Sequence, residues 1–128
     1  MNLLLDTHVA LWAIADSPRL PADARELIAA PNNTVWISVA TIWEIAIKHS
    51  LGRGEMPVNA ADARRYFTNS GYRFLAIEAE HAAAVEGLPA LHHDPFDRIL
   101  IAQALSEPLR LMTHDQTVAR YSDTIIRV

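Results

Sequence analysis

The sequence predicts an α/β protein of three layers, in which helices cover both faces of a mostly parallel five-stranded sheet. Short runs rich in β-branched residues alternate along the chain with longer segments of helical pattern. The short runs are continuously apolar, as strands are when helices cover both of their faces. The order strand-helix-helix occurs three times and is followed by strand-helix-strand. Parallel neighbours need such crossover connections, which is why this order favours a parallel sheet.

Five segments have the composition of buried strands. The clearest reads Val-Trp-Ile-Ser-Val, and all five are only three to five residues long. The predicted strands are Leu3–Leu5, Val35–Val39, Arg73–Ile77, Arg110–Thr113 and Thr124–Val128.

The segments between these strands carry helix start and stop signals. Pro21 precedes the first, Ser38 is the expected N-cap of the second, and Gly52, Gly71 and Gly87 follow later ones. The predicted helices are Asp23–Ala30, Ala40–Leu51, Ala60–Asn69, Glu78–Glu86 and Pro95–Leu105.

The helix that begins at Pro95 has the clearest boundaries. Asp94 is its expected N-cap, proline suits the first helical position, and Pro108 prevents the helix from continuing. Two shorter helices are expected directly after Asp6 and around Gln116–Tyr121.

Length and composition suit one soluble domain covering residues 1–128. About half of the 128 residues are apolar, and no cysteine is present, which excludes disulfides and thiolate metal sites. The N-terminal residues lack the basic region of a signal peptide and include Asp6. Pro31 interrupts the uncharged run Ile28–Trp43, so no membrane span is expected. We therefore expect a cytoplasmic protein.

The charge balance narrows the classes of nucleic-acid-binding protein that fit. Eleven basic and 15 acidic residues give a formal net charge of −4. Proteins that coat duplexes irrespective of sequence are usually basic, so this class is disfavoured. An enzyme that holds nucleic acid through bound metal ions remains compatible, because the cations supply the local positive charge.

Four carboxylates are predicted to lie at one rim of the sheet. Asp6 and Asp115 directly follow the first and fourth strands, and Glu44 lies about one turn into the helix that leaves the second. Asp97 lies in the first turn of the helix that Asp94 caps. Ligands of open α/β sheets bind just beyond the carboxyl ends of the strands, so these positions are compatible with one site.

Structural roles for three of these acids remain open at this point. Asp6 and Asp115 could each cap the helix that follows. Glu44 could complete a capping box with Thr41, or pair with Lys48 at i,i+4.

Asp97 is harder to explain by structure alone. The segment Phe96–Ala102 is apolar nearly all round, so a carboxylate there is expected to be partly buried, which is costly without a compensating charge. Like charges that converge on one rim repel each other unless a hard cation such as Mg²⁺ or Mn²⁺ neutralises them. Such a site suits phosphodiester hydrolysis by a metal-activated water.

Four motifs in order carry a resemblance that spans essentially the whole chain. They are Leu-Leu-Leu-Asp-Thr-His at 3–8, Ser-Val-Ala-Thr-Ile-Trp-Glu-Ile-Ala-Ile-Lys at 38–48, Asp-Pro-Phe-Asp-Arg-Ile-Leu-Ile-Ala-Gln-Ala at 94–104, and Thr-His-Asp at 113–115. With these motifs the chain resembles PIN-domain ribonucleases and, more narrowly, the VapC toxins of bacterial type II toxin–antitoxin systems.

The resemblance implies a sheet of strand order 3-2-1-4-5 and a set of site residues. The metal-binding and catalytic acids would be Asp6, Glu44, Asp97 and Asp115. The residues that support this site would be Thr7, Asp94 and Thr113.

The resemblance also implies Mg²⁺ or Mn²⁺ as cofactor, RNA as substrate, a homodimer, and a small antitoxin whose C-terminal arm occupies the active-site groove. Four carboxylates without an evident general base of another type predict cleavage of single-stranded RNA by a metal-activated water, without a covalent protein intermediate. Trp12, Trp43 and the segment Leu20–Leu27 are apolar enough to line such a groove. Core packing is the favoured prediction for Trp43.

Histidine and basic residues add weaker signals. None of the six histidines forms a helical pair spaced for zinc with a third ligand nearby, so structural zinc is not expected. For His8 and His114, an RNA contact and an exposed position without function are both open.

The basic grouping near the acids consists of Lys48, His49, Arg53 and Arg98. Lys48 is a candidate RNA contact or a partner of Glu44. Arg98 is a candidate RNA contact or a partner of Asp94.

Two other functional classes are weighed against the nuclease. A phosphoacceptor receiver domain needs an aspartate after a middle strand and a lysine after a late one. The third predicted strand instead runs into Glu78, and no lysine follows Lys48. A PIN-fold binding module without nuclease activity is the remaining alternative, and the four acids argue against it.

Overall fold

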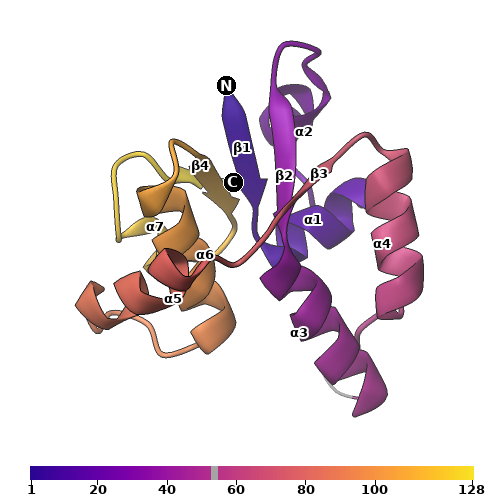
Figure 1. Cartoon of the computed structure of the whole chain (residues 1–128). Coiled ribbons are helices and arrows are strands. Elements are labelled where there is room, and N and C mark those ends of the chain that lie inside the picture. Colours follow the sequence, from indigo (N-terminus) through magenta and orange to yellow (C-terminus); the bar gives the residue numbers. More distant parts are fainter. Residues whose placement is uncertain (53–54) are drawn as a thin grey trace.

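The computed structural model describes residues 1–52 and 55–128 and has the predicted fold class. Its five strands pair in parallel in the order β3-β2-β1-β4-β5, so the predicted order 3-2-1-4-5 is confirmed (Figure 1). The strands are β1 (Asn2–Leu5), β2 (Thr34–Ser38), β3 (Arg73–Leu75), β4 (Arg110–Thr113) and β5 (Ile126–Arg127).

The helices follow in the predicted order. They are α1 (Thr7–Ile14), α2 (Ala22–Ala29), α3 (Val39–Ser50), α4 (Ala60–Asn69), α5 (Ala79–Ala84) with the 3₁₀ turn η1 (Val85–Gly87), α6 (Pro95–Ser106) and α7 (Gln116–Ala119). No helix within the described ranges combines the length and hydrophobicity that a membrane crossing requires.

Four predicted boundaries were wrong, each for a local reason. β2 ends at Ser38 because the Ser38 side chain accepts a hydrogen bond from the Ala40 amide and so starts α3 at Val39. Gly87 does not follow an α-helix but closes the tighter turn η1. The strands β3 and β5 are shorter than predicted, because edge strands pair on one side only and continue as loops.

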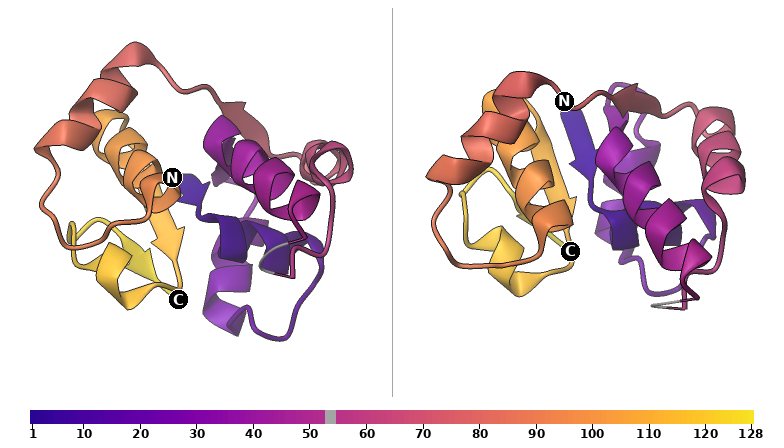
Figure 2. Two further views of the ribbon diagram at one scale, coloured as in Figure 1. Left: turned by 90° about the horizontal axis from the view of Figure 1, so that it is seen from below. Right: turned by 60° about the horizontal axis from the view of Figure 1, so that its bottom comes forward.

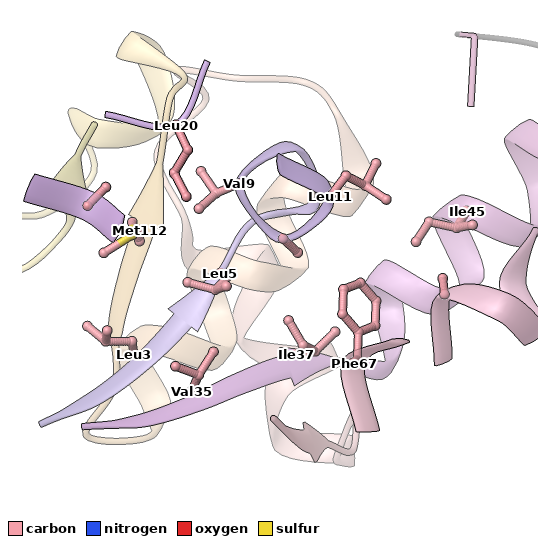
Figure 3. Packing of buried hydrophobic residues seen from close by; sticks show 13 residues of the cluster. Leu3, Leu5, Val9, Leu11, Leu20, Val35, Ile37, Ile45, Phe67 and Met112 are labelled. Atoms are coloured by element: carbon pink, nitrogen blue, oxygen red, sulfur yellow. The ribbon is translucent and has the colours of Figure 1, made fainter. Parts of the chain in front are cut away.

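Successive side chains of the central strands enter two separate cores. Leu3 and Leu5 point into the cluster that includes Val9 of α1 and Phe67 of α4, whereas Leu4 joins the cluster built on α6. Figure 3 shows the first cluster, and Figure 2 shows the strand β1 between the helices of the two sides. Because both faces are covered, the strands read as continuous apolar runs.

The register aligns the carboxyl ends of three strands. Leu5 lies beside Ile37 of β2 and Met112 of β4, so the next residue of each strand lies at the same rim. Asp6 is that residue on β1, Ser38 on β2 and Thr113 on β4, and the Asp6 amide donates to the Met112 carbonyl at 3.0 Å. The sheet thereby brings the starts of α1 and α3 together with the end of β4.

Replacing Ile37, which is fully buried under α1 and α4, tests this core. We expect Ile37→Ala to lower the free energy of unfolding by about 2–5 kcal/mol, because it leaves a cavity that the sheet cannot close. Leu51→Ala, at a position that is 60 % exposed, should change it by less than about 0.5 kcal/mol. Urea unfolding followed by circular dichroism measures both. Equal effects of the two substitutions would contradict the core described here.

Candidate functional site

A pocket of about 440 Å³ lies at the carboxyl rim of the sheet and contains all four predicted acids. They reach it from four separate segments: Asp6 from the end of β1, Glu44 from α3, Asp97 from α6 and Asp115 from the end of β4. The other residues that line the pocket are Thr7, His8, Trp12, Arg19, Lys48, His92, Asp94 and His114.

Asp6 is both a helix cap and a pocket residue. It is 5 % exposed, and its Oδ1 accepts from the Val9 amide at 2.9 Å at the start of α1. Its Oδ2 accepts from the Thr113 hydroxyl at 2.5 Å. Burial raises the pKa of Asp6 above its ordinary value, and these two hydrogen bonds oppose that shift. The two structural contacts hold the carboxylate in one orientation at the pocket wall.

Glu44 is held by partners on both of its oxygens. The Thr7 hydroxyl donates to Oε1 at 2.6 Å, and Lys48 Nζ donates to Oε2 at 2.5 Å. The pairing with Lys48 at i,i+4 is therefore present. The alternative capping box with Thr41 was wrong, since Ser38 caps α3 and the Thr41 hydroxyl lies 3.2 Å from that of Thr7.

Asp97 lies in the first turn of α6 beside His92. Asp94 caps this helix by accepting from the amides of Phe96 and Asp97, as predicted. The Asp97 Oδ2 lies 2.7 Å from Nε2 of His92. Burial raises the pKa of Asp97 to about 6, the His92 hydrogen bond lowers it, and the charges of Asp94 and Asp6 raise it further. Because the charge of Asp6 contributes to the raised pKa of Asp97, the two carboxylates are close enough to repel each other.

Asp115 completes the acidic wall. Its Oδ1 caps α7 by accepting from the Thr117 and Val118 amides, and its Oδ2 lies 4.0 Å from Nε2 of His92. Ligand atoms of His92, Asp97 and Asp115 lie within 4.8 Å of one another. This spacing is compatible with one cation shared by several donors.

Thr113 is buried beneath the acids and links two of them. Its hydroxyl accepts from the Asp115 amide at 3.0 Å and donates to Asp6 at 2.5 Å. The single hydroxyl proton of Thr113 therefore points at Asp6, while an oxygen lone pair faces the Asp115 amide. Thr113 therefore orients Asp6 from behind the pocket.

The donor set fits a hard divalent cation. Five carboxylates line the pocket but only two Lys or Arg side chains do. One of these two, Lys48, is already bonded to Glu44. Carboxylate oxygens are the ligands that Mg²⁺ and Mn²⁺ prefer. Buried acids such as Asp6 and Asp97, which burial disfavours as anions, gain most from a cation.

A second cluster, formed by Glu80, His81 and Glu107, brings donor atoms equally close. His81 is fully buried, and its Nδ1 accepts from the Glu78 amide at 3.0 Å. The proton of the neutral ring is therefore on Nε2, which lies 3.2 Å from Glu107 Oε1. With both ring nitrogens occupied, His81 is a packing and capping residue, and this cluster does not fit a metal ion.

Several residues lie elsewhere than the sequence indicated. Trp43, for which core packing was predicted, is 58 % exposed and meets Phe96 edge-on at 5.2 Å, so that prediction was wrong. The Arg98 guanidinium donates to four backbone carbonyls between residues 85 and 92 and to the Tyr121 hydroxyl. Among the ion pairs of residues 1–52 and 55–128, none joins Arg98 to Asp94. Arg53 lies outside the described residues.

Sequence reasoning missed Arg19 and His92 as pocket residues. Arg19 belongs to the turn between α1 and α2, where Leu20 is buried and anchors the chain beside the pocket. Its place could not be read from local pattern. His92 stands two residues before the cap Asp94, and that closeness to the motif was the available signal.

Comparisons with known proteins agree with this geometry. The sequence model of the PIN domain matches residues 3–123. A chain of the VapBC2 structure from Rickettsia felis, bound to a promoter DNA fragment, has a TM-score of 0.72 at 20 % identity and covers 100 % of this chain and 98 % of its own. A chain of the DNA-bound VapBC structure from Salmonella typhimurium gives 0.68 at 16 % identity, with coverages of 100 % and 97 %.

The FitAcB structure from Neisseria gonorrhoeae gives a TM-score of 0.59 at 16 % identity, with coverages of 100 % and 97 %. No curated protein matches the sequence significantly. At these identities the solved structures establish the shared fold.

The raised pKa of Asp97 predicts how stability depends on pH in metal-free buffer. Between its ordinary value of 3.8 and about 6, the folded chain holds more protons than the unfolded chain. Stability from this group is therefore complete below pH 3.8 and lost as pH rises through 6. We expect Asp97→Asn to be more stable than the wild type above pH 6 by on the order of 2 kcal/mol, and the difference to vanish near pH 4.

Urea unfolding with EDTA at several pH values measures this difference. Asp123→Asn, at an exposed turn, is the matched control and should follow the wild-type profile. A wild-type and an Asp97→Asn profile that run parallel would show that Asp97 titrates normally.

Proposed function

The chain belongs to the PIN domain family, and from that premise we propose that it is a Mg²⁺- or Mn²⁺-dependent endoribonuclease. One observation supports this proposal above all others. Acids from four segments far apart in the sequence meet in one pocket at the carboxyl rim of the sheet. Such crowding of like charge is costly, and a pocket that binds hard cations explains why the fold tolerates it.

The chain's own residues would position the cation and the RNA phosphate. Asp6, Glu44, Asp97 and Asp115 would hold a divalent cation, which would supply a water of lowered pKa and neutralise charge that develops on the phosphate. Thr113 and Thr7 hold Asp6 and Glu44 in fixed orientations.

No protein nucleophile is proposed for the reaction. The Thr7 hydroxyl in the pocket already donates to Glu44, so it is a poor candidate for attack on phosphorus. The proposed reaction is direct attack by water, which cleaves the phosphodiester bond without a covalent intermediate.

We further propose that the chain is the toxin of a type II toxin–antitoxin pair. Similar folds occur in structures named VapBC, and one from Klebsiella pneumoniae is described as a toxin–antitoxin complex. The partners would be a small antitoxin and a second copy of the chain, and the site of action would be the cytoplasm. A PIN-fold binding module without nuclease activity is the alternative.

Cleavage of a mixed pool of structured RNA tests the proposed activity. Purified wild-type protein should cut in Mg²⁺ or Mn²⁺ and stop in EDTA. Asp97→Asn should reduce the rate by at least about a hundredfold, because it removes one cation ligand and the charge that holds the cation. Gel analysis of fragments with time gives the rates.

Asp123→Asn serves as the control for the same chemical change at an exposed position and should retain full activity. If the wild type fails to cut RNA in both Mg²⁺ and Mn²⁺, the binding-module alternative holds. Equal cutting by the wild type and Asp97→Asn would remove Asp97 from the site.

Thr113→Val tests the support of Asp6 separately from catalysis. Losing the hydroxyl frees Asp6 from its 2.5 Å hydrogen bond, and we expect Mn²⁺ to bind about tenfold to a hundredfold more weakly. Isothermal titration calorimetry measures this affinity without RNA. Thr124→Val, at an exposed position, should bind Mn²⁺ as the wild type does. Unchanged affinity in Thr113→Val would show that the orientation of Asp6 is set by other contacts.

A further inference from the structure

A second hollow of about 310 Å³ adjoins the acidic pocket on the side of α1. Three residues line both spaces: His8, Trp12 and Arg19. A strand whose phosphate lies at the acids and which leaves the pocket on this side must therefore pass these three residues. None of them is needed to hold the carboxylates.

Trp12 is fixed on α1 and partly accessible. Its side chain packs against the core cluster on one side and is half-buried. The ring of His114 meets it edge-on at 5.1 Å, and the ring of His8, one helical turn earlier, lies 6.2 Å away at 42°. An indole held in this way needs little ordering before it stacks on another ring, which lowers the entropic cost of binding.

Arg19 is the cation of the pocket that has no carboxylate partner among the described residues. The other one, Lys48, is bonded to Glu44 at 2.5 Å. The Arg19 amide donates to the Ser17 side chain at 3.2 Å, and the neighbouring Leu20 is buried, so the turn that carries Arg19 is anchored. Its guanidinium is thus available to a phosphate.

We propose that Trp12 and Arg19 form the subsite for the nucleotide next to the scissile phosphate, a proposal that rests on the proposed ribonuclease function. The indole stacks on the base, and the guanidinium binds the phosphate of the same nucleotide. Because a base must leave its own stack to reach Trp12, this subsite selects unpaired RNA over duplex.

Binding measured apart from cleavage tests the role of Trp12. In an Asp97→Asn background with Mg²⁺, fluorescence anisotropy gives the affinity for a labelled single-stranded RNA. Trp12→Leu keeps the apolar contact with the core but removes the ring, and should weaken binding by roughly fivefold to a hundredfold. Trp12→Phe should lose less affinity for the RNA, because it keeps an aromatic ring. Trp43→Leu, the same change at an exposed tryptophan outside the pocket, should have no effect.

The salt dependence of binding tests the role of Arg19. Each phosphate contact to single-stranded nucleic acid adds about 0.7 to the slope of log affinity against log salt. Arg19→Ala should lower the slope by about that amount, and Arg19→Lys should restore much of it. Arg64→Ala, at an exposed position on α4 away from the pocket, should leave the slope unchanged.

Tryptophan fluorescence gives an independent readout that does not require a destabilising change at Trp12. The chain has three tryptophans, so Trp36→Phe with Trp43→Phe leaves Trp12 as the sole reporter. Stacked RNA bases should quench it on binding. RNA that binds with no quenching and with the same affinity for Trp12→Leu would overturn the subsite and leave the nuclease proposal intact. Wild-type protein that neither binds nor cuts RNA would overturn both.

Discussion

Repulsion among carboxylates at the rim of the sheet is the constraint on which the rest of the site depends. Parallel strands that end level bring Asp6 and Asp115 together, and the helices that follow add Glu44 and Asp97. Each of these acids has its own local compensation. The Thr113 hydroxyl donates to Asp6, Lys48 donates to Glu44, and His92 lies 2.7 Å from Asp97. Asp115 accepts instead from the Thr117 and Val118 amides. Even so, burial and neighbouring charge hold the pKa of Asp97 near 6, which shows that the compensation is incomplete.

Helix N-termini explain how the fold tolerates this charge. Asp6, Asp94 and Asp115 cap α1, α6 and α7, where unpaired amides and the helix dipole favour an anion. In Asp6 and Asp115 one oxygen takes the cap, and the other oxygen of Asp115 faces His92. Structural and functional roles are therefore combined in the same side chains, and evidence for capping does not count against a role in the site.

The helix α1 connects the parts of the site most directly. It starts at the cap Asp6, and its first residue, Thr7, donates to Glu44 of α3. His8 and Trp12 are four residues apart, so they share the face of α1 that borders the pocket. Because the opposite face, with Val9 and Ala10, is buried in the core, the orientation of this helix is fixed by packing. The positions of Asp6 and Thr7 and those of His8 and Trp12 thus depend on the same apolar contacts.

The sequence by itself determined the helices and strands, the positions of the acids at strand ends, and the caps at Ser38 and Asp94. It could do so because the spacing of apolar residues and the chemistry of helix caps are local signals. Only the tertiary structure decided which helix faces meet solvent and which distant turns meet the pocket. Trp43 is therefore exposed despite its apolar helix, and Arg19 enters the pocket from a turn with no motif. These outcomes depend on contacts between residues far apart in the chain, and a local pattern carries no information about such contacts.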